Sequence, residues 1–406
     1  MKLLILIFVV IGGLYKLLLS IEQLRSAGNP TPQNVSDIYD AETYLKWKKY
    51  NAEHSRLGIV FSIISTAVTL ALLCTNAFAA FAALFPKGIF MQLFAVVLLE
   101  TLVDFIIGIP NSYISNMIIE EKYGFNRTTG KTFVADLIRG LLLNLILSVA
   151  LAGIITLCHL WLGDAMVILC AAVLVGFSLL ITFLYPFFSR IGNKFTPLEE
   201  GELRERLEKL LTSHGYTVRA IEVMDASRRT TKQNAYFTGF GKLKTIVLYD
   251  NLVNAMTPDE ICAVFAHELG HGLHKDTLQL QLLNVCNLTL MAVIAWLLVS
   301  TESLHTAFGF ETVNYGFAGT LLGAVLGITS PFTGMVINAC SRRFEYAADR
   351  QAVKEGYGAA MIPALKKLAK DNFAHLAPSK LHVVLEYSHP PIDKRIAAIE
   401  AEMKNT

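Results

Sequence analysis

The stretch TPDEICAVFAHELGHGLH, residues 257–274, places a metal-binding pattern on one predicted helix. Its first four residues form a capping box with proline at the first helical position, so a helix begins here. His267 and His271 are four residues apart, which puts both imidazoles on one helical face, one turn apart. Two histidines at this spacing can hold one Zn²⁺, and Glu268 between them would lie beside the ion.

The same motif is suited to peptide hydrolysis. A catalytic zinc keeps three protein ligands and one water. Glu268 would take the proton from that water as it attacks the scissile carbonyl, while the metal lowers the pKa of the water and polarises the carbonyl oxygen. The alternative is a chance pentapeptide whose histidines are merely buried or solvated. The capped helix and the apolar run from Ile261 to Ala266 favour the catalytic interpretation.

A third ligand is expected from the segment SRRFEYAAD, residues 341–349. Glu345 and Asp349 are four residues apart and share a helical face. Glu345 would bind the zinc, and Asp349 would accept a hydrogen bond from a ligand histidine or handle a proton in the reaction. The alternative is a charged helix face that forms ion pairs with neighbouring arginines.

The composition of the chain places much of it in a membrane. Of its 406 residues 53% are hydrophobic and only 17% are charged, a balance far too apolar for a soluble protein of this length. A helix needs about 20 mainly apolar residues to cross a bilayer. Seven candidate spans satisfy this length, at residues 3–20, 57–85, 89–109, 133–160, 165–188, 279–300 and 315–339. We interpret the first as a retained helix rather than a secretory signal, because it lacks a clear cleavage site.

The basic residues between the spans predict an orientation. Lysines and arginines gather in the loops after spans one, three and five, whereas the loops after spans four and six have none. Basic loops face the cytoplasm under the positive-inside rule, so residues 190–278 and 340–406 should both lie there, with the active site. Two spans separate the histidine pair from Glu345, and an even number of crossings returns the chain to the same side. Compact loops favour a bacterial cytoplasmic membrane, with the endoplasmic reticulum membrane as the alternative.

Some charged residues fall inside predicted spans, where charge is costly and usually faces a bundle interior or a wet cavity. Glu100 and Asp104 share one face of the third span and are expected to do so. For Asp136 and Arg139 in the fourth span, a cavity and the membrane interface are equally good interpretations.

The stretches outside the membrane predict a small α+β domain. A second capping box, TPLE at residues 196–199, should open an amphipathic helix. Three β-rich runs follow, at 217–223, 235–240 and 245–249, and the last two should form a hairpin. An exposed strand edge can bind an extended peptide as a further strand. We therefore expect Asn234, Ala235 and Tyr236 to contact substrate, although ordinary sheet packing would explain Tyr236 equally well.

These features together predict a mainly α, polytopic membrane protein with about seven transmembrane helices and a small zinc-protease domain split across two segments. The expected division is 1–189 for spans one to five, 190–278 for the first protease segment, 279–340 for spans six and seven, and 341–406 for the second protease segment.

At these residues the chain resembles the integral-membrane CAAX prenyl endopeptidases, zinc metalloproteases with an H-E-x-x-H motif and a distal glutamate. The resemblance extends over nearly the whole chain. It includes IEEKYGFN at 119–126, NAYF at 234–237, TIVLYD at 245–250 and YSHPP at 387–391, with Arg395 close behind.

The resemblance implies a hollow barrel of seven helices around a water-filled chamber, and removal of the last three residues after a prenylated cysteine. It also implies roles for individual residues. The zinc ligands are His267, His271 and Glu345, the catalytic base is Glu268, Asp349 orients a ligand or donates a proton, and His389 and Arg395 stabilise the oxyanion or hold the substrate backbone. Without the resemblance, His389 could equally be a helix cap and Arg395 a surface ion-pair former.

The expected partners are the lipid bilayer and membrane-associated peptides or proteins, prenylated or otherwise docked. The chain itself is expected to be a monomer that holds one zinc ion. A formal net charge of +2 without basic patches argues against nucleic acid. One alternative function is a quality-control protease for misfolded membrane proteins, which fits a bacterium because bacteria are not expected to make prenylated substrates. Another is a zinc-binding membrane protein or transporter without proteolytic activity. Glu268 argues against this second alternative, because a structural zinc needs no such carboxylate.

Overall fold

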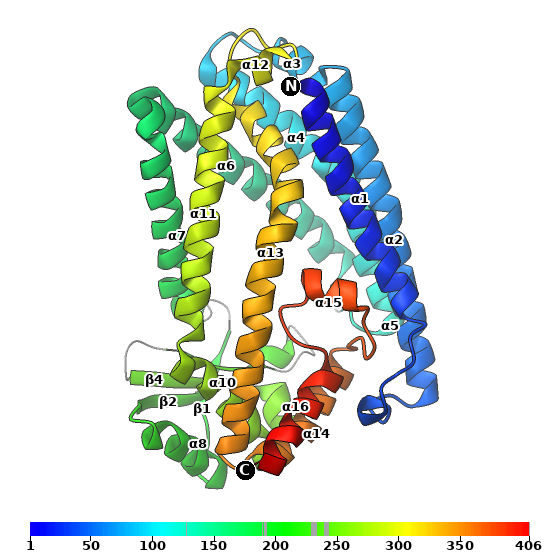
Figure 1. Cartoon of the computed structure of the whole chain (residues 1–406), viewed down its shortest axis with the longest axis vertical. Helices are drawn as coiled ribbons and strands as arrows, with labels where there is room; N and C mark the ends of the chain where they lie inside the picture. The colour runs from blue at the N-terminus through cyan, green and yellow to red at the C-terminus, as the bar shows by residue number, and fades with distance from the viewer. Residues whose placement is uncertain (127, 189, 191–192, 229–233, 239–242, 406) are drawn as a thin grey trace. The chain divides into compact units, whose positions relative to one another are not determined.

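The computed structural model describes residues 1–405 apart from 127, 189, 191–192, 229–233 and 239–242; the chain is drawn in Figure 1. The described residues form two compact units, each built from three separate stretches of chain. The first unit comprises Met1–Arg25, Lys49–Ser178 and Asn284–Gly334, and the second comprises Ser26–Lys48, Leu179–Leu283 and Met335–Thr406. Both predicted protease segments fall in the second unit.

Six stretches of the described chain are helical, long and apolar enough to cross a membrane. They are Lys2–Ser26, Ala41–Cys74, Ile89–Tyr123, Gly130–Ile181, Asp276–Ser300 and Tyr315–Lys354. The fourth stretch contains two of the predicted spans, because α6 (Gly130–Leu162) and α7 (Met166–Phe188) are joined only by the 3-10 turn Gly163–Ala165. The prediction of a mainly α, polytopic membrane protein is therefore confirmed, whereas the enclosed chamber stays a prediction.

The second predicted span is misplaced. Helix α2 (Ala41–Cys74) ends eleven residues before the predicted limit of 85. Asn76 takes a left-handed backbone conformation with φ of 56°, which an α-helix cannot continue through. The short helix α3 (Ala77–Ala82) follows this break.

The first unit also contains other helices, some of which extend into the second unit. They are α1 (Lys2–Ser26), α4 (Ile89–Ser112), a π-helix (Tyr113–Glu120), α5 (Glu121–Tyr123), α11 (Asp276–Ser300), α12 (Glu302–Thr306) and α13 (Tyr315–Lys354). Helix α13 runs for 40 residues without a break. Glu345 therefore lies on the same helix as the last predicted span, rather than in a separate segment.

The charged residues of the third predicted span line a cavity within the first unit. Glu100 and Asp104 face a space of about 300 Å³ together with the polar side chains of Asn144 and Ser148 on α6. Glu100 also accepts a hydrogen bond from Thr320 at 2.9 Å. This agrees with the expected cavity location. Asp136 and Arg139 instead pair with each other at 3.5 Å and are largely exposed.

A four-stranded sheet forms the framework of the second unit, in the order β1-β2-β4-β3. Its strands are β1 (Phe195–Pro197), β2 (Thr217–Met224), β3 (Ala235–Thr238) and β4 (Leu243–Tyr249). Strands β2 and β4 are parallel, and β1 and β3 each add antiparallel at one edge. The predicted pairing of the last two strands is confirmed, while their connection at 239–242 lies outside the described residues.

The predicted capping box at 196–199 is wrong. Its first residues form β1, in which Thr196 pairs with Val223 of β2, and the N–H of Leu198 donates to the carbonyl of Ile221 at 2.9 Å. The amphipathic helix itself, α8 (Glu202–Ser213), begins later, after Gly201. Strand pairing with a distant segment has overridden the local capping signal.

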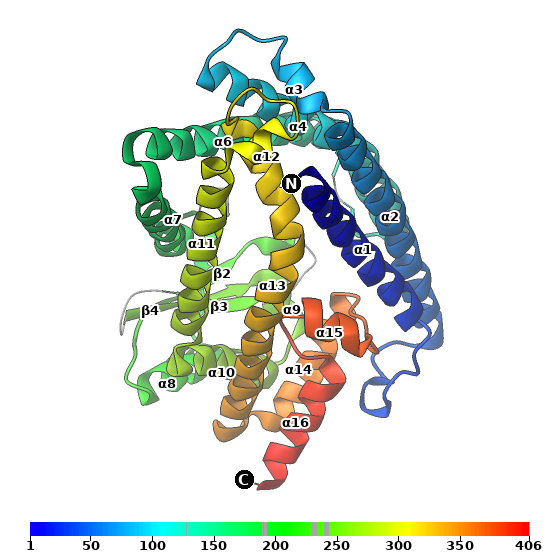
Figure 2. The same cartoon turned by 45° about the horizontal axis from the view of Figure 1, so that its top comes forward.

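The helices that lie wholly in the second unit include α10 (Pro258–His274), which carries His267, Glu268 and His271. Besides α8 and α10 they are α9 (Asp250–Ala255), α14 (Gly358–Asp371), α15 (Lys380–Glu386) and α16 (Ile392–Asn405), with 3-10 turns at Gln33–Val35 and Ala226–Arg228. Helices α8 and α10 lie against the sheet (Figure 2), where Leu207, Leu211 and Phe265 are fully buried in one apolar core with Ile246 and Leu248 of β4. This core holds α10 rigidly.

The predicted capping box of α10 is present. The side chain of Thr257 accepts a hydrogen bond from the N–H of Glu260 at 3.3 Å, and the Glu260 carboxylate accepts one from the N–H of Thr257 at 2.7 Å. Glu260 is buried and also pairs with Lys367 of α14 at 2.6 Å. The start of the motif helix is thus fixed ten residues before His267.

Replacing Thr257 with alanine should loosen the first turn of α10 by about 1 kcal/mol, because one buried N–H loses its acceptor. Hydrogen–deuterium exchange of residues 258–262 should speed up accordingly. Thr212→Ala, which removes an exposed hydroxyl bonded only within its own helix, serves as the control and should leave that exchange unchanged. If residues 258–262 exchange at the same rate in Thr257→Ala and in Thr212→Ala, Thr257 does not cap α10.

Candidate metal centre

The two motif histidines meet on one face of α10. Their Nε2 atoms are 3.2 Å apart, and the rings cross nearly at right angles, at 87°. His267 is buried, and His271 keeps 22% of its side chain exposed. The four-residue spacing in the sequence therefore produces the paired imidazoles that it predicted.

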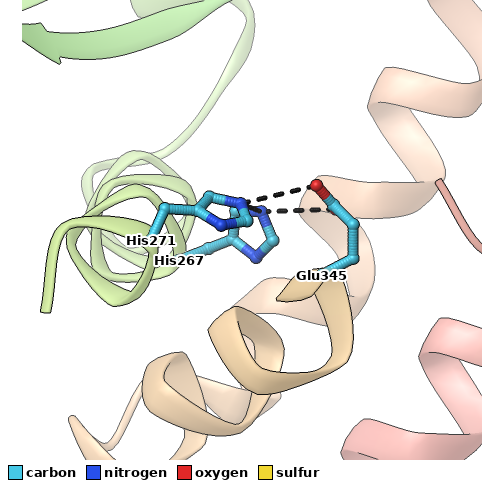
Figure 3. A group of neighbouring side chains, drawn as sticks. All are labelled: His267, His271 and Glu345. Carbon is cyan, nitrogen blue, oxygen red and sulfur yellow. Dashed lines mark hydrogen bonds and ion pairs between the residues drawn. The ribbon is translucent and has the colours of Figure 1, made fainter. Parts of the chain in front are cut away.

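Glu345 reaches this pair from α13. Its carboxylate oxygens lie 3.5 Å from Nε2 of His267 and 3.4 Å from Nε2 of His271. Figure 3 shows both rings pointing at the carboxylate. One ligand atom from each of the three residues lies within 4.8 Å of the others, and no further histidine, cysteine or acid of the described chain joins the group. Three donors of this kind with one open position match a catalytic metal site.

The close approach of the two helices depends on Gly270. A Cβ at this position would lie 2.9 Å from the Cα of Ala348 on α13, and 3.0 Å from the Cβ of Gln351. A side-chain carbon cannot lie this close to a backbone carbon, so one of the two helices would have to move. Gly270 thus lets α10 lie near enough to α13 for Glu345 to meet the histidines.

Carboxylates hold the other nitrogen of each imidazole. His267 donates from Nδ1 to Asp349 at 2.9 Å, and His271 donates from Nδ1 to Asp276 at 2.8 Å. A proton fixed on each Nδ1 leaves the Nε2 lone pairs directed at the same point. Sequence analysis found Asp349 through its spacing from Glu345. It missed Asp276, the first residue of α11, because nothing local distinguishes it from a helix cap.

Arg395 is buried among these carboxylates. Its guanidinium donates to both oxygens of Asp349, at 2.9 and 2.6 Å, and lies 3.1 Å from Glu345. Only 6% of the residue is exposed. The alternative interpretation of Arg395 as a surface ion-pair former is therefore wrong.

His389 lies at the edge of the same group. Its Nε2 is 3.3 Å from Glu345, and 65% of its side chain is exposed. The segment before it is anchored to α13: Arg342 donates to the carbonyl of Val383 at 2.9 Å and also to that of Tyr387, and Asn338 donates to the carbonyl of Leu385 at 3.0 Å. One helix thus supplies both Glu345 and the anchor for His389. No local sequence pattern predicts this anchoring.

The electrostatics of the site favour a cation. Burial raises the pKa of Glu268, and the opposing effect of the two neighbouring histidines does not cancel this. Burial alone would lower the pKa of His271, but its hydrogen bonds to Glu345 and Asp276 prevail and raise the pKa to about 9. Carboxylates that attract a proton to this point attract a metal ion for the same reason.

A cavity of about 440 Å³ adjoins the donors. Glu268 and Arg395 line it with Asn234 and Ala235 at the start of β3. The apolar part of its wall comes from Leu252, Val264, Met361, Leu365 and Leu368. Tyr236, predicted to contact substrate, is half-buried and packs against the small core of Met224, Ala226 and Val247. The predicted substrate segment therefore borders the donors through Asn234 and Ala235.

The sequence and the structure both match known proteins. Residues 20–190 match the family described as "CAAX prenyl protease N-terminal, five membrane helices", and residues 197–403 match "Peptidase family M48". The chain belongs to peptidase family M48. It is a membrane-embedded metalloendopeptidase, and its predicted resemblance to the CAAX prenyl proteases is confirmed.

Relatives of this peptidase cover nearly its whole length. It is 31% identical to the CAAX prenyl protease 1 homolog of Arabidopsis thaliana, with 98% of this chain and 97% of the relative aligned. It is 28% identical to the homolog of Homo sapiens, over 91% and 88% of the two chains. Its fold superposes on the crystal structure of S. mikatae Ste24p with a TM-score of 0.87 at 26% identity, covering 98% and 99% of the chains.

Replacing Gly270 with alanine should force α10 and α13 apart and cost about 1–3 kcal/mol, as overpacking typically does. We expect a lower melting temperature and less bound metal per chain, measured by elemental analysis of the purified protein. Gly323→Ala is the control, because Gly323 lies on α13 and no atom is within 4 Å of the added methyl group. Full metal content in Gly270→Ala would show that the contact does not position Glu345.

Proposed function

We propose that this peptidase holds one zinc ion between His267, His271 and Glu345 and removes the C-terminal tripeptide after a prenylated cysteine. The observation that carries the proposal is the convergence of two imidazoles and one carboxylate beside Glu268, at the wall of a cavity. Nitrogen and carboxylate donors in this combination suit zinc. The names of the relatives, CAAX prenyl protease 1 homologs, support the substrate class.

In the proposed reaction, Glu268 moves the proton. It accepts a proton from the attacking water and passes it to the amide nitrogen that leaves. Its burial suits this task, because a carboxylate with a raised pKa is a stronger base. When bound, zinc would lower the pKa of the water and polarise the scissile carbonyl.

The neighbouring residues keep the donors in place. Arg395 holds Asp349 and Glu345 together through its guanidinium, so we assign it a positioning role rather than direct contact with the oxyanion. Asp349 orients His267 by accepting its Nδ1 proton. His389 has a largely exposed ring beside Glu345, and we assign it the hydrogen bond to the developing oxyanion.

The substrate backbone would bind along β3. This strand forms an edge of the sheet, since it pairs only with β4 within the described chain. An extended peptide can add to such an edge through main-chain hydrogen bonds, which we place at Asn234, Ala235 and Tyr236. The apolar wall of the adjoining cavity would then accept an aliphatic side chain beside the scissile bond.

We further propose that the site faces the cytoplasm and that the chain acts as a monomer. The distribution of lysine and arginine between the spans supports the orientation. A bacterial cytoplasmic membrane stays our prediction for the compartment, with the endoplasmic reticulum membrane as the alternative. The relatives described above are eukaryotic.

The proposal predicts chelator-sensitive cleavage of a farnesylated C-terminal peptide by the detergent-purified protein. Glu268→Gln should retain zinc yet lose at least about 100-fold in kcat, because it removes the proton acceptor but no ligand. Product release by mass spectrometry and metal content by elemental analysis measure the two effects separately.

Glu205→Gln, an exposed glutamate on α8, is the matched control and should keep full activity. Equal cleavage of farnesylated and unmodified peptides would favour the quality-control alternative over CAAX processing. Cleavage that survives both chelation and Glu268→Gln would contradict the zinc mechanism itself.

A further inference from the structure

Asp276 is a buried carboxylate whose side chain makes one hydrogen bond within the described residues. It is the first residue of α11, and 3% of it is exposed. Its Oδ2 accepts the Nδ1 proton of His271 at 2.8 Å. Its other oxygen, Oδ1, is buried and has no hydrogen-bond donor among the described residues. The carboxylate is thus directed at a single histidine.

A tight turn fixes the direction of this side chain. Lys275, between α10 and α11, has a φ of 58°, in the left-handed region that side chains other than glycine seldom adopt. The N–H of Lys275 donates to the carbonyl of Gly272 at 3.2 Å, and the side-chain amide of Gln279 donates to the carbonyl of His274 at 2.9 Å. The chain therefore reverses so that Asp276 points back at His271.

Such a carboxylate does little to stabilise the fold. Desolvation of a buried charge commonly costs as much as a single ion pair returns. The N-terminus of α11 favours negative charge at this position, which explains how the carboxylate is tolerated but not why it is directed at His271.

The two aspartates that accept hydrogen bonds from the histidines, Asp349 and Asp276, have different surroundings. Asp349 shares its charge between His267 and the guanidinium of Arg395. Asp276 contacts no lysine or arginine in the described part of the chain, and its only ion-pair partner there is His271. No other ion pair within the described residues shares the negative charge of Asp276, so this charge acts mainly on the imidazole of His271.

We propose that Asp276 is a positioning residue that orients His271 and strengthens its hold on the metal. It keeps the proton on Nδ1, so that Nε2 presents its lone pair to the ion, and its negative charge makes that lone pair a better donor. The inference rests on the proposed zinc site and adds to it a residue that sets metal affinity.

The test is the zinc affinity of the full-length protein in detergent, measured by competition with a chromophoric chelator. Asp276→Ala should weaken zinc binding by about 10- to 100-fold. Asp276→Asn keeps an acceptor oxygen but not the charge. Its zinc affinity should lie between those of Asp276→Ala and the unmodified protein. The melting temperature of the metal-free protein should fall less in Asp276→Ala than in Glu260→Gln, because Glu260 holds both the cap of α10 and an ion pair with Lys367.

Glu260→Gln is the matched control, since Glu260 is also a buried carboxylate but lies in the first turn of α10, where it belongs to the capping box. It should lower the melting temperature and leave zinc affinity unchanged. The absorption bands of bound Co²⁺ should shift in Asp276→Ala, where His271 can rotate, but not in Glu260→Gln.

The inference is overturned if Asp276→Ala binds zinc within twofold of the unmodified protein, or if Glu260→Gln loses affinity to the same extent. Failure of the unmodified protein to bind zinc would instead contradict the proposed function. The two failures are therefore distinguishable in one series of measurements.

Discussion

Helices α10 and α13 touch at Gly270 and Ala348, and the proposed metal centre depends on this contact. One helix supplies two imidazoles and the other a carboxylate, from positions more than 70 residues apart in the sequence. Within the described chain, neither helix alone brings three ligand atoms to one point. The contact is possible because Gly270 has no side chain and because an apolar core holds α10 against the sheet.

The charge balance at this contact explains why a cation belongs there. Glu268, Asp276, Glu345 and Asp349 surround the two histidines, whereas the buried guanidinium of Arg395 pairs with Glu345 and Asp349. Several buried carboxylates around one arginine leave an excess of negative charge, which is costly in a desolvated site. A divalent ion between the donors relieves this excess, so metal binding and the stability of the site are linked.

Local signals explain most of what sequence analysis predicted correctly. The capping box before α10, the spacing of His267 and His271, and the apolar lengths of the spans each depend on residues close together in the chain. The position of Glu345 beside the two histidines was also predicted from the sequence, because its spacing to Asp349 repeats the period of a helix. Parity of the membrane crossings then placed it on the side of the histidines.

Contacts between distant segments explain most of what was missed. The sequence TPLE at 196–199 matches a helix capping box, yet its first two residues belong to β1, which pairs with β2. The loop predicted after the first span contains Val35 and Tyr39, which are buried against α14 and α16 in the second unit. Asp276 is separated from His271 by a left-handed lysine that no sequence pattern predicts. Each depends on a partner or a backbone angle that the local sequence does not reveal.

The coordination of the metal tests the central claim most directly. X-ray absorption at the zinc K-edge of the purified protein reports how many nitrogen, oxygen and sulfur atoms surround the ion. The account predicts one zinc per chain with two imidazole nitrogens and oxygen ligands, changing when Glu345 is replaced by alanine. Sulfur ligands, or a spectrum unaffected by that replacement, would contradict it.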